Sequence, residues 1–174
     1  MKFLLRLKSW QLFLLFVLPY FLTSVPVVGI VFLLIWTVSY VGWIYAIGTT
    51  MYDLLPVEKN KLWIKHFKYC CILYGVAIIA IFMLSGLLGS TDFMNKYPVD
   101  LFIVFPVSIY IAFSIYMFAA RMLESMIEGR IVYRSDALRA FFYIWMFPLG
   151  VWYIQPAIRR VLDKYSNDVV KNHT

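Results

Sequence analysis

Long runs of apolar residues, separated by short polar connections, make up most of this sequence. A transmembrane helix needs about 20 consecutive apolar residues, and several of these runs approach or reach that length. Prolines and clusters of charged residues mark the boundaries between the runs. The pattern predicts an all-α integral membrane protein with four transmembrane helices, at about residues 10–25, 27–47, 69–90 and 101–120.

The first two predicted spans are joined by a turn that carries no charge. Pro26 lacks a backbone N–H and disfavours the helical conformation of Val25, so the two helices are expected to form a tight hairpin. Lys2 and Arg6 precede the first apolar run, as they would in a secretory signal peptide. No small-residue cleavage site follows, and we interpret this segment as a retained first helix.

Residues 121–139 are expected to form an amphipathic connection on the cytoplasmic side. Met122, Met126 and Ile127 keep apolar residues at helical spacing, which is typical of a helix that leaves the membrane. We predict a break at Gly129 and a new helix with Ser135 as its N-cap.

The last apolar stretch, residues 140–158, differs from the others. The sequence Pro148-Leu149-Gly150 interrupts it, Pro156 lies near its end, and both favour a bend. Its tyrosines and tryptophans prefer the level of the lipid headgroups. We therefore predict a re-entrant or interfacial aromatic helical hairpin, followed by a cytoplasmic tail at 159–174; a fifth span is the alternative.

The distribution of positive charge predicts the orientation. Of the 16 lysines and arginines, all but Lys96 lie at the amino end, in the connection 53–68, in the connection 121–139 or in the tail. With four spans these regions share one side, which should be the cytoplasm, with both termini there. A fifth span would place Arg159 and Arg160 outside, which argues against it.

Composition supports a membrane setting, since 63% of the 174 residues are hydrophobic and only 14% are charged. The length allows a single membrane domain, residues 1–174. The basic residues behind the net charge of +7 form no separate basic domain. We therefore expect them to contact the anionic surface of the lipid bilayer, and we expect no nucleic acid as a partner.

Two patches of the sequence resemble segments of small, uncharacterised bacterial multi-pass inner-membrane proteins. They are residues 7–15, LKSWQLFLL, and residues 147–158, FPLGVWYIQPAI. The resemblance implies the inner (plasma) membrane of a bacterium as the setting and implies no activity.

The candidate chemistry is sparse. The central turns of the four spans hold no charged residue or histidine, which argues against charge-coupled transport. Arg121, Glu124 and Glu128 share one face of the extended fourth helix; they could ligate a metal or act as acid and base, but an intrahelical Arg–Glu pair is favoured. Gln155 is expected either to satisfy backbone groups freed by the prolines or to line a small pocket.

Other residue types give no sign of a catalytic or cofactor site. Cys70 and Cys71 are expected to be buried thiols, and His66 and His173 to be solvated. No hydrolase, zinc-protease or phosphate-loop motif occurs, and we expect no metal, no cofactor and no enzymatic activity. A third possibility, an intramembrane enzyme that acts on lipid, would need Asp53, Glu124 or Glu128 at the membrane surface as its reactive group.

The sequence therefore favours a non-enzymatic membrane protein. We expect a small subunit or accessory interaction component of a membrane complex, with other membrane subunits or further copies of itself as partners. A small oligomeric transporter or channel is the alternative. The candidate interaction or pocket residues are Arg121, Glu124, Glu128, Trp152 and Gln155.

Overall fold

The computed structural model describes residues 2–22, 28–55, 61–88 and 98–171, and these residues contain helices and turns but no strand. The helices are α1 (Lys2–Arg6), α2 (Ser9–Leu22), α3 (Val28–Leu54), α4 (Lys61–Leu88), α6 (Pro98–Glu128), α7 (Leu138–Trp145) and α8 (Val151–Lys171). The predicted turn at Pro26 and the side chain of His173 lie outside the described residues. The all-helical fold class is confirmed.

Three helices are long and apolar enough to cross a membrane, within Gly29–Leu54, Trp63–Ile81 and Pro106–Glu128. The chain is thus suited to a bilayer by length and composition. The first predicted span corresponds to α2, whose 14 residues measure about 21 Å at 1.5 Å per residue. That length is shorter than the hydrocarbon core of about 30 Å.

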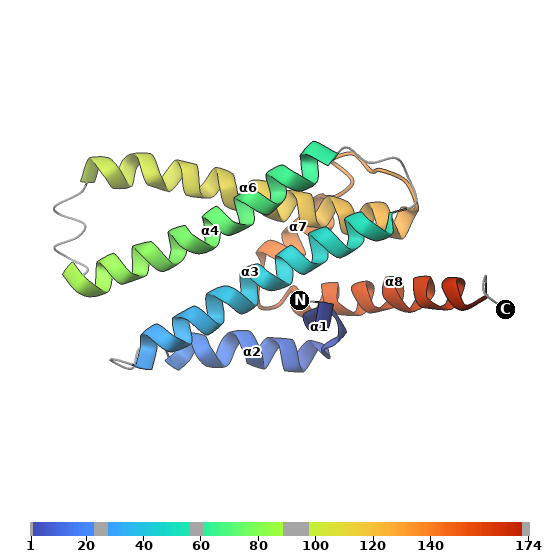
Figure 1. Cartoon of the computed structure of the whole chain (residues 1–174), viewed down its shortest axis with the longest axis horizontal. Coiled ribbons are helices and arrows are strands. Elements are labelled where there is room, and N and C mark those ends of the chain that lie inside the picture. The colour runs from blue at the N-terminus through green and yellow to red at the C-terminus, as the bar shows by residue number, and fades with distance from the viewer. Residues whose placement is uncertain (1, 23–27, 56–60, 89–97, 172–174) are drawn as a thin grey trace.

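Helix α3 forms the centre of the bundle and contacts α1, α2, α4 and α6. Trp43, Ile44, Ile47 and Met51 on this helix are fully buried. Gly48 allows α4 to approach closely, since a Cβ atom there would overlap the ring of Phe67. In Figure 1, α3, α4 and α6 run along the molecule with successive helices pointing in opposite directions, and α2 lies beside α3.

Several helix boundaries differ from the predicted ones. The lysine-rich connection is shorter than expected, because α3 continues to Leu54 and α4 begins at Lys61. As expected for a helix that leaves the membrane, residues 121–128 continue α6, and this helix ends at Glu128. The predicted break at Gly129 is confirmed by its positive φ of 71°, a conformation that favours glycine.

The prediction of Ser135 as an N-cap is wrong. Helix α7 begins at Leu138, its N-cap position is Ala137, and no side chain caps it. The hydroxyl of Ser135 instead donates a hydrogen bond to the carboxylate of Asp136, at 3.1 Å. A local side-chain bond has thus replaced the cap that the sequence indicated.

The predicted bend at Pro148-Leu149-Gly150 is confirmed, since α7 and α8 are separated by a turn at residues 146–150. Gly150 is required there, because a Cβ atom would overlap the backbone carbonyl of Tyr143. Pro156 causes no further break, and α8 runs through it to Lys171.

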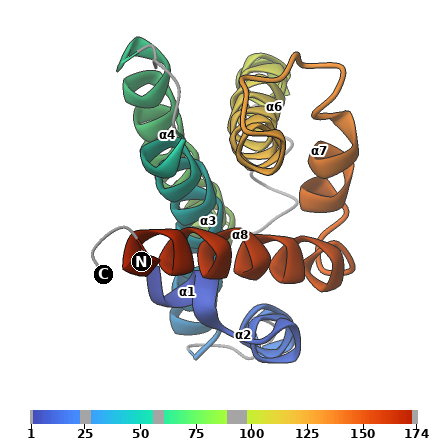
Figure 2. The same ribbon diagram turned by 90° about the vertical axis from the view of Figure 1, so that its right-hand side faces the viewer.

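One side chain of this α7–α8 turn, Phe147, packs into the bundle, while Met146 and Leu149 are exposed. The ring of Phe147 packs against Phe16 of α2 and Tyr40 of α3, with centroid distances of 5.0 and 4.8 Å. Tyr40 lies near the middle of α3. In Figure 2, α7 lies beside α6 at the edge of the molecule, and after the turn α8 crosses the bundle at a steep angle to α7.

Candidate functional site

Gln155 links the two ends of the chain. Its side chain is fully buried on α8, and its Nε2 donates hydrogen bonds to the carbonyl oxygens of Leu4, Leu5 and Leu7, at 3.1, 2.9 and 2.9 Å. Its Oε1 accepts a hydrogen bond from the indole Nε1 of Trp43, at 3.2 Å. The last carbonyls of a helix have no partner within that helix, so Gln155 caps α1 from a distance.

Of the two roles expected for Gln155, the structure therefore shows hydrogen bonding to backbone groups rather than the lining of a pocket, but the backbone groups are not the expected ones. The carbonyls that it satisfies belong to α1 and the residue after it, not to the prolines of α8. Together with the indole of Trp43, this one amide holds α1, α3 and α8 in a fixed arrangement. Trp43 was not among the predicted site residues, because nothing in its sequence context indicates a hydrogen-bonded indole.

Arg121 holds the turn that follows α6. Its Nε donates a hydrogen bond to the carbonyl oxygen of Val132, at 2.7 Å, and its guanidinium lies 4.7 Å from the centroid of the Trp63 ring. The N–H of Val132 in turn donates to the hydroxyl of Ser125, at 3.1 Å. These bonds satisfy both backbone groups of a buried residue, which is a structural role.

The predicted intrahelical pair between Arg121 and a glutamate is wrong. Glu128 pairs with Arg130 instead, at 2.7 Å, and both side chains are substantially exposed. An exposed ion pair contributes little to the free energy of unfolding. Arg121 bonds a backbone carbonyl because the turn at Gly129 brings Val132 back against α6. The three charged residues therefore do not form one site.

Glu124 and Trp152 do share a surface, which we call the α6–α8 pocket. It has a volume of about 500 Å³ and lies between α6, α7 and α8. Two arginines that the sequence did not single out, Arg139 and Arg160, line it as well. The guanidinium of Arg139 lies 5.1 Å from the ring centroid of Tyr153. The pocket thus combines one carboxylate, two guanidinium groups and aromatic rings.

The predictions for the cysteines are confirmed, since Cys70 and Cys71 are buried and free. Cys70 Sγ lies 3.4 Å from His66 Nε2, and the imidazole of His66 is exposed. Within the described ranges, no group of three histidine, cysteine or acidic side chains is placed to hold a metal ion.

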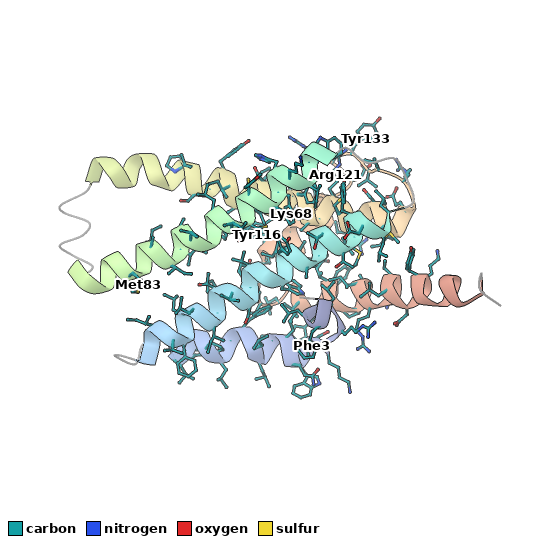
Figure 3. All side chains as sticks on the ribbon, viewed as in Figure 1. Phe3, Lys68, Met83, Tyr116, Arg121 and Tyr133 are labelled. Atoms are coloured by element: carbon teal, nitrogen blue, oxygen red, sulfur yellow. The ribbon has the colours of Figure 1, made fainter. Side chains whose placement is uncertain are left out.

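Three tyrosine hydroxyls meet inside the bundle. The hydroxyl of Tyr116 on α6 lies 3.3 Å from that of Tyr40 on α3 and 3.3 Å from that of Tyr74 on α4. This chain of hydrogen bonds joins the three longest apolar helices (Tyr116 is labelled in Figure 3).

No protein-family model matches the chain, and no curated protein or solved structure is significantly similar to it. The conclusions on function therefore rest on the geometry of this chain.

Proposed function

We propose that this chain is a multi-pass protein of the bacterial inner membrane, with four spans, a re-entrant C-terminal hairpin and both termini in the cytoplasm. Its support is the placement of charge. The helix ends and turns that carry Lys61, Arg130 and Lys164 lie at one end of the bundle (Figure 1). Positive charge collects on the cytoplasmic side of membrane proteins, so that end should face the cytoplasm.

The contacts of Phe147 support the hairpin over a fifth span. A fifth span would continue past the depth of Tyr40 to the opposite end of the bundle, whereas α8 leads back toward the basic end. The return keeps Arg159 and Arg160 on the cytoplasmic side.

Cysteine accessibility tests this topology. In a chain with both native cysteines replaced by alanine, single cysteines are placed at Lys164 and, as the external control, at Lys96. An impermeant maleimide added to intact spheroplasts should label position 96 and should reach position 164 only after lysis. Labelling of position 164 in intact spheroplasts would contradict the hairpin.

We further propose a non-enzymatic role, as a small subunit or accessory component that presents α8 to a partner protein. One observation carries this proposal. The first half of α8 is anchored by the buried amide of Gln155, and its second half extends beyond the ends of α3 and α6 (Figure 1). A rigid helix held at one end loses little conformational entropy when its other end binds a partner.

The surface that α8 offers is mixed in charge. Arg159, Lys164 and Asp163 are exposed on its outer part, and Arg160 borders the α6–α8 pocket with Glu124. Such a surface favours a partner with polar and acidic groups at the cytoplasmic face.

Site-specific photo-crosslinking in cells tests the role of α8. A photoreactive amino acid is placed at Tyr165 on α8, and at Leu73 on α4 as a control of comparable exposure (41% and 56%). We expect a discrete protein adduct from position 165 that the control position does not give. Adducts between copies of this chain alone, or equal adducts from both positions, would contradict the proposal; the first result would favour an oligomeric transporter or channel.

A further inference from the structure

A second cavity, separate from the α6–α8 pocket, lies between α4 and α6. Its volume is about 430 Å³, and we call it the α4–α6 groove. Figure 2 shows these two helices diverging on the side of the bundle away from α2. Tyr110 and Phe113, which line the groove, are 65% and 46% exposed, so the groove opens sideways toward the surrounding lipid.

One end of the groove is strongly basic. Arg121 and Arg134 both line it, and none of its lining residues is acidic. The bond from Arg121 Nε to Val132 and the contact with the Trp63 ring fix the position of the guanidinium. That bond uses only one of the five N–H donors of an arginine, and a guanidinium in a fixed orientation is well suited to a phosphate group.

The rest of the groove is mainly apolar and aromatic, with His66, Cys70 and Ser114 as its other lining residues, and it has the length of one membrane leaflet. From Arg121 to Tyr110 the groove follows α6 for about 16 Å, at 1.5 Å per residue. Half of the hydrocarbon core of a bilayer measures about 15 Å. Between these residues the lining includes the rings of Phe113 and Phe118, which suit an acyl chain.

We propose that the α4–α6 groove binds an anionic phospholipid of the cytoplasmic leaflet. Its phosphate lies between Arg121 and Arg134, and one acyl chain follows α6 toward the centre of the bilayer. Two cations in a groove that no acidic residue lines favour a lipid with net negative charge over a zwitterionic lipid. This inference rests on the proposed orientation, in which the basic end faces the cytoplasm, but not on the proposed partner, because the groove is distinct from the surface of α8.

Native mass spectrometry of the full chain in mild detergent tests the site. The chain is offered equal amounts of phosphatidylglycerol and phosphatidylcholine of the same chain length. We expect one phosphatidylglycerol to be retained in preference. Arg134→Gln should weaken its binding about fivefold, because a basic side chain near an anionic lipid contributes about 1 kcal/mol.

The controls separate a site from general attraction. Arg134 is exposed, so its replacement should leave the fold intact. Arg159→Gln removes another exposed charge, outside the groove, and should leave lipid binding unchanged. Ser114→Trp fills the groove without changing its charge and should also release the lipid. Equal retention of the two lipids, or equal loss with Arg159→Gln, would overturn the proposal. Full displacement by inorganic phosphate would overturn it too, since it would show a site for the anion alone.

Discussion

The buried amide of Gln155 makes the strongest prediction about stability. Gln155→Met keeps the length of the side chain and a similar helix propensity, so the change removes hydrogen bonds with little change in packing. The amide has two N–H donors, shared by three carbonyl oxygens, and one acceptor, used by the indole of Trp43. Methionine cannot replace any of them.

The magnitude follows from the groups left behind. The indole N–H of Trp43 and the carbonyl of Leu5 are buried and would lose their partner. Each such group costs about 1–3 kcal/mol, so we expect a loss of about 3–4 kcal/mol in the free energy of unfolding. For a chain of this size, that loss should lower the melting temperature by about 10 °C.

The other glutamine of the chain provides a matched control. Gln11 makes a single hydrogen bond, in which its Oε1 accepts from the exposed N–H of Lys8 at 2.9 Å. Water can replace this bond, so Gln11→Met should cost less than about 1 kcal/mol. The assay is thermal unfolding in detergent, followed by intrinsic tryptophan fluorescence and by size-exclusion chromatography after heating.

Two outcomes would refute the reasoning. One is an equal shift in melting temperature for Gln155→Met and Gln11→Met. The other is strict additivity of Gln155→Met and Trp43→Phe in a double-mutant cycle, because residues in direct hydrogen-bond contact should show a coupling of about 0.5–3 kcal/mol.

Two further predictions concern the close contacts inside the bundle. Gly150→Ala places a methyl group against the backbone carbonyl of Tyr143 and should lower the melting temperature strongly. Gly75→Ala is the control, because the nearest atom to its added methyl group lies at 4.0 Å, and it should be neutral or slightly stabilising. Equal effects of the two variants in the fluorescence assay would contradict the packing of the turn. Tyr116→Phe removes the hydroxyl that Tyr40 and Tyr74 share and should lower the free energy of unfolding by about 1–2 kcal/mol. Tyr110→Phe is the control, at a side chain that is 65% exposed, and should lower it by less than about 0.5 kcal/mol. A Tyr116 variant as stable as its control would show that the hydroxyl chain contributes nothing to stability.

Local sequence signals predicted the positions where the backbone breaks. Gly129 and the sequence Pro148-Leu149-Gly150 were identified correctly, because a positive φ and a missing N–H act on the residue itself. Ser135 failed as an N-cap for the opposite reason. Whether a serine caps a helix depends on where the next helix begins, and the packing of α7 against α6 set that start at Leu138.

The candidate site was less accessible to sequence reasoning. Spacing along one helix placed Arg121 beside Glu124 and Glu128. In the structure, Arg121 instead donates a hydrogen bond to the carbonyl oxygen of Val132, in the loop that follows α6. Arg139 and Arg160 went unrecognised, since only the fold brings them together with Glu124.

By itself, the sequence determined that this chain is helical and suited to a membrane. Hydrophobic length and the distribution of charge are properties of the linear chain, because the bilayer acts on each segment separately. Only the tertiary structure decided that Gln155 binds the backbone of α1, about 150 residues away, and that α4 and α6 leave a basic groove between them. Hydrogen-bond partners and cavities depend on which helix faces meet, and that arrangement exists only in the folded chain.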